Sequence, residues 1–254
     1  MRMTSFKNSR AIGWVVSAFG VGVLGAASQV LAAAPQCTAT TQSAATVVEL
    51  YTSEGCSSCP PADRWLSTLK GRPDVLALAF HVNYWDRLGW PDRFASAEAT
   101  ERQHLLASAA RSSTVYTPQI VVNGRDERSG LNLAGKTLAP ASAQLTLARE
   151  GGSVVARLSA GTTATRLAGY WAVLEDKHQT KVRAGENSGE TLLHDHVVRL
   201  YKPVAPWTGD KAFSSQLSIS AGDAANPRRA AFVVVDPATQ RPLQAATLAL
   251  PAGC

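Results

Sequence analysis

Two cysteines separated by two residues, Cys56 and Cys59, stand where a strand-like run ends and a helical pattern begins. The run over residues 46–52 is β-branched and aromatic, which predicts a strand. Two prolines follow Cys59, and proline is tolerated in a first helical turn, so we expect a helix that continues over residues 62–69. A nearly continuous apolar run at 75–82 predicts a second, parallel strand. These segments form a strand, helix, strand unit, which restricts the chain to folds with a parallel sheet.

The next segments extend this unit. The loop 83–94 is rich in aromatic residues and leads into a predicted helix at 97–111, for which Ser96 is a suitable N-cap. Thr117-Pro118 precedes an apolar strand, and Asn123-Gly124 is the strongest short signal for a hairpin. The segment 35–139 is therefore predicted to form an α/β domain.

The pattern changes from about residue 140. Seven or eight short strand-like runs with turn signals between them predict an all-β sandwich, similar to an immunoglobulin domain, over residues 140–254. The expected runs cover residues 144–149, 154–158, 166–175, 180–183, 196–201, 216–220, 230–236 and 243–250.

The first 34 residues have the three parts of a secretory signal peptide. Arg2, Lys7 and Arg10 precede an apolar stretch, and small residues suited to a peptidase follow it. An uncleaved membrane anchor is the alternative. We expect an exported protein, periplasmic or secreted, that meets the membrane only through this leader. The formal net charge is +6, but the basic residues are scattered, so no nucleic-acid partner is expected.

The pair Cys56 and Cys59 suits thiol–disulfide exchange. A thiolate is stabilised at a helix N-terminus, so Cys56, which is expected to cap the helix and to be the more exposed cysteine, is the predicted nucleophile. Cys59, one turn later and more buried, is expected to resolve the mixed disulfide. An inert disulfide and half of a zinc site are the alternatives. Zinc would require a second pair of ligands at similar spacing, which the sequence lacks, so we expect no metal site and no cofactor.

Several motifs resemble a family of secreted bacterial proteins that combine a thioredoxin-like fold with a domain of unknown function. They are ELYTSEGCSSCPPAD from Glu49, HVNYWD from His81, VYTPQ from Val115 and GENSGETL from Gly185. The resemblance implies a thioredoxin-like α/β domain and identifies no substrate. It also implies that Pro118 follows a cis bond, faces the two cysteines and docks an extended substrate by strand pairing.

One position in this sequence differs from ordinary thioredoxins. Gly55 stands where thioredoxins carry a tryptophan, so an aromatic surface for the substrate would have to come from elsewhere. The hypothesis is that Tyr84, Trp85 and Trp90 provide it, because their loop leaves the same sheet edge as Cys56. Simple packing at the edge of the domain is the alternative.

Other polar residues are candidates for supporting roles. Glu49 and Glu54 are candidate proton-transfer groups for Cys59. His81 with the two cysteines can provide a copper site of two sulfurs and one nitrogen, or be an ordinary hydrogen-bonded histidine. His194 and His196, two residues apart, are expected on one strand face as a surface pair, with a metal pair as the alternative.

These observations predict an exported thiol–disulfide oxidoreductase that acts on protein thiols together with an unknown redox partner. A binding protein with a structural disulfide and a copper-delivery protein are the alternatives. The sequence contains four cysteines, so Cys37 and Cys254 are left to form a second disulfide, with free or intermolecular thiols as the other possibility.

Overall fold

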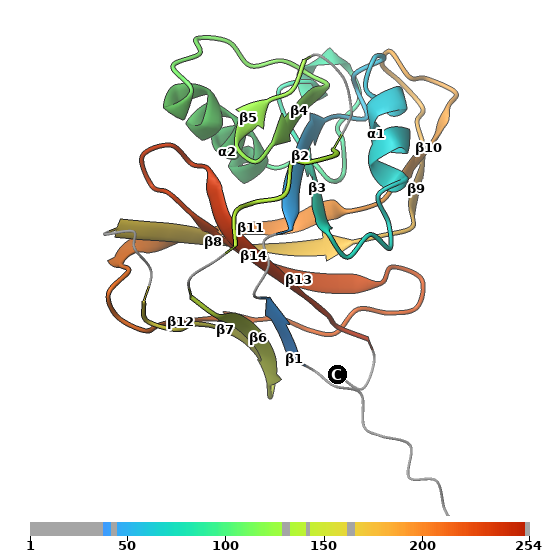
Figure 1. The fold of residues 1–254 in the computed structure, drawn as a ribbon. Helices are drawn as coiled ribbons and strands as arrows, with labels where there is room; N and C mark the ends of the chain where they lie inside the picture. The colour runs from blue at the N-terminus through green and yellow to red at the C-terminus, as the bar shows by residue number, and fades with distance from the viewer. Residues whose placement is uncertain (1–37, 42–44, 129–132, 141–142, 162–165, 252–254) are drawn as a thin grey trace, which may run out of the picture. The chain divides into compact units, whose positions relative to one another are not determined.

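The computed structural model describes residues 38–41, 45–128, 133–140, 143–161 and 166–251 (Figure 1). The signal peptide predicted at 1–34 and the bridge predicted between Cys37 and Cys254 lie outside these residues. Within the described ranges, no helix is long and apolar enough to cross a membrane.

One large mixed sheet has eight strands in the order β14-β13-β8-β11-β3-β2-β4-β5. In chain order the strands are β2 (Thr46–Thr52), β3 (Val75–His81), β4 (Gln119–Val122), β5 (Arg125–Asp126), β8 (Arg166–Glu175), β11 (Val197–Thr208), β13 (Arg228–Val235) and β14 (Pro242–Ala249). Strands β2 and β3 are parallel over their full length, from Thr46 opposite Val75 to Thr52 opposite His81.

Two α-helices cover the faces of the β2–β3–β4 region (Figure 1). Helix α1 (Pro60–Ser67) packs on the face that presents Val48 and Leu50. Helix α2 (Ala97–Ala109) packs on the opposite face, which presents Val47 and Tyr51. Ser96 accepts a 3.1 Å hydrogen bond from the Ala99 N–H, so the predicted N-cap is confirmed.

A smaller sheet lies against the β8–β13–β14 part of the large one. Its strands are β1 (Thr38–Thr41), β6 (Leu145–Glu150), β7 (Ser153–Leu158) and β12 (Phe213–Ser218), in the order β1-β6-β7-β12. Leu145, Leu147 and Val154 from this sheet share a core with Trp171 and Phe232 from the large one. Apolar burial between the two layers stabilises this end of the molecule.

Two short elements lie between strands of the large sheet in the chain. A two-stranded ribbon consists of β9 (His178–Lys181) and β10 (Thr191–His194). The 3-10 helix η1 (Asp86–Leu88) lies in the loop of residues 83–94, here called the aromatic loop. The loop between β9 and β10 contributes to the site described below.

The predicted fold class, a thioredoxin-like α/β domain followed by a separate immunoglobulin-like sandwich, is wrong. The protein is mostly β, and its described part contains two α-helices. Strand β11 pairs with β3, with Val197 opposite Ala79, so the edge of β3 is not free. Four strands from the second half of the chain therefore extend the sheet of the first half instead of closing a sandwich of their own.

Candidate functional site

Cys56 and Cys59 form a disulfide with a Cα–Cα distance of 5.4 Å. Helix α1 begins at Pro60, so Cys59 takes the N-cap position, and the expectation that Cys56 would take it is wrong. Both cysteines are 0% exposed. The greater exposure expected for Cys56 is therefore not found in the disulfide form.

Backbone hydrogen bonds hold the turn between the cysteines. The Cys56 N–H donates to the Ser53 carbonyl, and the Cys59 N–H donates to the Cys56 carbonyl, each at 3.1 Å. The Ser58 hydroxyl lies 3.5 Å from the Cys56 sulfur and is the donor, because a disulfide sulfur carries no proton. The two serines between the cysteines are exposed, although the disulfide itself is not.

The aromatic loop packs directly on this turn. A Cβ atom at Gly55 would lie 3.1 Å from the Cβ of Trp85, so a side chain at this position would require Trp85 to shift. The Trp85 indole N–H donates a 2.8 Å hydrogen bond to the Thr117 hydroxyl, while the Tyr84 hydroxyl bonds Gln103 in α2 at 3.3 Å.

Pro118 follows a cis peptide bond, as predicted. It lines a pocket of about 480 Å³. The other lining residues are Thr114, Tyr116, Ile120, Glu127 and Arg128.

Glu54 is fully buried immediately before the turn. Its carboxylate accepts a 2.8 Å hydrogen bond from the Trp90 indole and lies 3.2 Å from Nε2 of His194. Burial raises the pKa of Glu54, but the interactions with His194 and Trp90 outweigh it, and the pKa lies below its usual value. Glu54 is therefore held as a buried carboxylate two residues from Cys56.

His81 and Asp92 form a second buried pair next to Glu54. Their Nδ1 and Oδ2 atoms are 2.6 Å apart, and the same carboxylate oxygen accepts the Glu54 N–H at 2.9 Å. Burial lowers the pKa of His81, but the charge and hydrogen bond of Asp92, together with the charges of Asp63 and Glu54, outweigh it, so the pKa lies above the usual value. Asp63, one turn after Cys59 in α1, accepts a 3.1 Å hydrogen bond from Thr52, and burial raises its pKa.

Glu49 takes part in a different network. Its carboxylate accepts hydrogen bonds from Arg102 at 2.8 Å, Tyr51 at 2.6 Å and Tyr170 at 2.8 Å. These partners come from α2, β2 and β8, and Arg102 itself is 1% exposed. The structure thus places Glu49 in a buried ion pair on the α2 face, whereas Glu54 adjoins the disulfide.

The expected surface pair of His194 and His196 is wrong. His194 ends β10, whereas His196 has a φ of 59° and directly precedes β11. Both are buried, His194 beside Glu54 and His196 beside Arg229, whose guanidinium lies 3.0 Å from Nδ1. Burial and the charge of Arg229 lower the pKa of His196 to about 4. Among the described residues, no three or more His, Cys, Asp or Glu side chains are arranged so that they could hold a metal ion.

The sequence did not predict that the β9–β10 loop contacts the disulfide turn. The Asn187 side chain donates to the carbonyls of Glu54 and Cys56 at 2.8 and 3.0 Å. The Glu186 carboxylate accepts from the Ser57 N–H at 3.0 Å and from its hydroxyl at 2.7 Å. The motif that contains both residues supported the resemblance to a family, but no local signal linked it to the cysteines 131 residues earlier.

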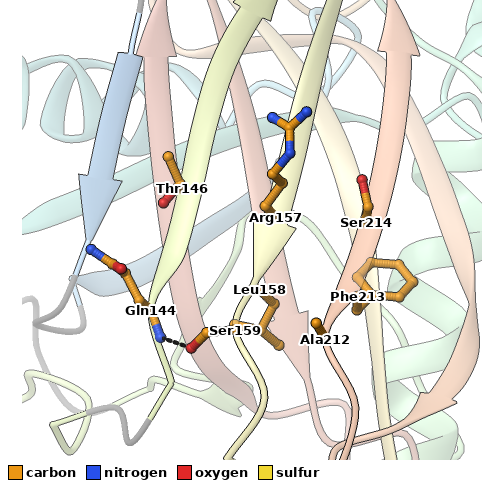
Figure 2. Close-up of a pocket in the computed structure, with 8 residues that line it drawn as sticks. All are labelled: Gln144, Thr146, Arg157, Leu158, Ser159, Ala212, Phe213 and Ser214. Atoms are coloured by element: carbon orange, nitrogen blue, oxygen red, sulfur yellow. Dashed lines mark hydrogen bonds between the residues drawn. The ribbon is translucent and has the colours of Figure 1, made fainter.

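Another pocket lies on the smaller sheet. It has a volume of about 340 Å³ and is lined by residues that include Thr146, Arg157 and Phe213, on β6, β7 and β12 (Figure 2). At its edge the Gln144 N–H donates to the Ser159 hydroxyl at 2.9 Å. None of its lining residues belongs to the disulfide turn.

Most of the chain, including this disulfide, matches a family model. Residues 47–236 match the family described as "Protein of unknown function (DUF1223)". The chain belongs to the DUF1223 family. The matched region of this DUF1223 protein contains the disulfide turn, the aromatic loop and the β9–β10 loop. A comparison with curated proteins found no match.

Two solved structures are similar to this DUF1223 chain. Protein AGR_C_4864 from Agrobacterium tumefaciens is 28% identical, with a TM-score of 0.62 over 82% of this chain and 96% of that one. HBP35 of Porphyromonas gingivalis is 13% identical, with a TM-score of 0.58 over 83% of this chain and 76% of that one. The second likeness concerns the fold alone.

Proposed function

We propose that this DUF1223 protein is an exported thiol–disulfide oxidoreductase that acts on protein thiols. The observation that carries the proposal is the Cys56–Cys59 disulfide, closed across a two-residue turn at the N-terminus of α1. The dipole and the free N–H groups of a helix N-terminus stabilise a thiolate, which is the species that reacts. The predicted leader supports the export that the proposal requires.

The proposed reaction uses Cys56 as the sulfur that exchanges. A substrate thiolate attacks Sγ of Cys56, a mixed disulfide forms, and Cys59 leaves as a thiolate that takes a proton. A second substrate thiolate then attacks the substrate sulfur of the mixed disulfide and releases Cys56. The substrate loses two electrons and the protein gains them. The reverse sequence reduces a substrate disulfide, and an external redox partner restores the starting form.

The surroundings supply groups for these steps. Glu54 and Asp63 flank the pair in sequence and are buried, so either can exchange a proton with Cys59 in a site that excludes water. The pocket beside Pro118 and the half-buried Trp85 offer a surface on which an extended polypeptide can dock.

A second candidate function is supported by a specific observation. Neither cysteine is exposed in the disulfide form, which is what a structural disulfide in a binding protein would show. Exchange chemistry requires that a thiol reach Cys56, so the two functions differ in a measurable property.

The experiment uses the exported protein with Cys37 and Cys254 replaced by serine, so that only one dithiol remains. We expect this protein to oxidise a reduced peptide dithiol or to reduce a peptide disulfide. Cys56→Ser should abolish the exchange, and Cys59→Ser should accumulate a mixed disulfide through Cys56. A protein that exchanges with neither reporter, and whose disulfide resists excess dithiothreitol under native conditions, would overturn the proposal in favour of a structural disulfide.

A further inference from the structure

The loop between β9 and β10, residues 182–190 and here called the cap loop, is closed by its own hydrogen bonds. The Val182 N–H donates to the Glu190 carbonyl at 2.9 Å, and the Gly189 N–H donates to the Val182 carbonyl at 3.0 Å. Within the loop, Ser188 donates to Gly185 at 3.2 Å. The cap loop is therefore an ordered hairpin that can hold side chains at fixed positions.

The cap loop packs closely against the aromatic loop. A Cβ at Gly185 would lie 3.1 Å from the Cβ of Trp90, and the φ of Gly185 is +74°, so both space and backbone conformation favour glycine there. Trp90 is in turn bonded to Glu54. The next two residues, Glu186 and Asn187, contact the disulfide turn.

Glu186 and Asn187 hold different parts of that turn. The Asn187 amide binds the carbonyls of Glu54 and Cys56 and is only 6% exposed. The exposed Glu186 carboxylate binds the N–H and the hydroxyl of Ser57, the residue directly after Cys56. These hydrogen bonds hold the pKa of Glu186 below its usual value, so it carries a negative charge at neutral pH.

We propose that Glu186 is a positioning residue that favours the oxidised form of the Cys56–Cys59 pair, by placing a negative charge against the residue that follows Cys56. The proposal rests on the proposed function and adds an internal control of its reactivity. A thiolate at Cys56 would lie close to the Glu186 carboxylate and compete with it for the donors of Ser57. Both effects raise the free energy of the reduced, ionised form.

The same charge hinders an incoming reagent. A thiol attacks as an anion, and it must approach a sulfur that is buried and adjacent to the cap loop. Displacement of Glu186 from Ser57 removes the repulsion. By thermodynamic reciprocity, reduction of the pair weakens the contact between Glu186 and Ser57 to the same extent that the contact disfavours reduction.

Among the described residues, the buried titratable groups near the turn include Glu54, Asp63, His81, Asp92 and His194. None of them is altered by a substitution at Glu186, so a matched pair of charge-removing variants isolates the effect of this carboxylate.

The test compares Glu186→Gln with Glu190→Gln, which removes a charge from an exposed residue of the same loop. Glutamine keeps an oxygen that can accept from Ser57, so the geometry is retained and the charge is lost. Both variants are made in the background without Cys37 and Cys254. The readouts are the rate of reduction by dithiothreitol, the equilibrium with a glutathione redox buffer, and the pH at which reduced Cys56 becomes reactive to an alkylating reagent.

For Glu186→Gln we expect reduction about 3 to 10 times faster, a similar shift of the equilibrium toward the dithiol, and a lower thiol pKa of Cys56. The differences should shrink in about 1 M salt, because screening weakens an exposed charge. Ser57→Ala, which removes one donor to Glu186, should change all three readouts in the same direction and less strongly.

Glu190→Gln should match the parent protein. Equal behaviour of the Glu186 and Glu190 variants would overturn the inference, and so would a faster reduction without a change in thiol pKa. Neither result bears on the proposed function, since these readouts use small reagents and no protein substrate. Failure of the parent protein to exchange with peptides would instead overturn the proposed function.

Discussion

The Trp85 indole donates a 2.8 Å hydrogen bond to the Thr117 hydroxyl, which ties the aromatic loop to the residue before Pro118. Trp85 also lies against Gly55, so one side chain connects the disulfide turn with the Pro118 segment. These two parts of the candidate site are thus held together by a residue that belongs to neither.

Replacing Trp85 with phenylalanine should lower the free energy of unfolding by about 0.5–1.5 kcal/mol, the usual contribution of one such hydrogen bond. Urea denaturation measures it, and Trp65→Phe on α1 controls for the loss of an indole ring. The exchange rate should change less than in Trp85→Ala, which also removes the ring. An unaltered stability in Trp85→Phe would show that the bond to Thr117 contributes nothing measurable.

Gly55→Ala tests the close packing beneath Trp85. The added Cβ would lie 3.1 Å from another Cβ, so we expect a loss of about 1–3 kcal/mol, as for other overpacked buried sites. The matched control is Gly152→Ala, where an added Cβ meets no atom within 4 Å. Equal stability of the two variants in urea would contradict this packing.

The local elements could be predicted from the sequence because their signals lie within a few residues. Strand β2 spans the predicted 46–52, and β8 spans the predicted 166–175. Helix α2 begins at the predicted residue because Ser96 supplies a cap for its free N–H groups.

The arrangement of the strands could not be predicted in the same way. A β-branched, alternating run indicates a strand but does not identify its partner. The pairing of Val197 with Ala79 joins segments far apart in the chain and unites the two halves in one sheet. The left-handed φ of His196 separates it from His194, and histidine gave no signal for that turn.

In the candidate site, too, local features could be predicted from the sequence and long-range contacts could not. The pairing of Cys56 with Cys59 could be predicted from their spacing, because two cysteines three residues apart can reach the short Cα–Cα distance that a disulfide requires, here 5.4 Å. The contacts of Glu186 and Asn187 with the disulfide turn could not be predicted, since their partners are 129 to 133 residues away and only the folded chain brings them together. The roles of Glu49 and Glu54 differ for a similar reason, namely that Arg102 approaches Glu49 alone.

The ion pair between Arg102 and Glu49 is predicted to be important for stability. Arg102→Met leaves a buried carboxylate without its cation and should cost about 3–5 kcal/mol in urea denaturation. Arg64→Met on the exposed face of α1 is the control. The double variant Arg102→Met with Glu49→Gln should lose less than the two single losses combined, because no buried charge is left unpaired. Strictly additive losses would argue against a direct pair.

The ion pair between His81 and Asp92 predicts a dependence of stability on pH. Burial lowers the pKa of His81, but Asp92, with smaller contributions from Asp63 and Glu54, raises it above the usual value of 6.5. The contribution of charged His81 is therefore complete below about pH 6.5 and is lost as the pH rises through the folded-state pKa. Burial raises the pKa of Asp92, but the charge of His81 and the hydrogen bonds from His81, Glu54 and Phe94 together lower it from 3.8 to about 2. Its contribution is present above about pH 4 and is lost as the pH falls toward 2.

The pair should thus stabilise the fold most between about pH 4 and pH 6.5. We expect Asp92→Asn to lose more stability at pH 5 than at a pH above the folded-state pKa of His81, as measured by urea denaturation. In the same variant the imidazole of His81, followed by NMR, should titrate below 6.5, because burial then dominates. His196 is an internal reference, since burial and Arg229 hold its pKa at about 4 with or without Asp92. A loss of stability in Asp92→Asn that is constant with pH, or that grows as the pH rises, would show that His81 is not charged in the folded protein.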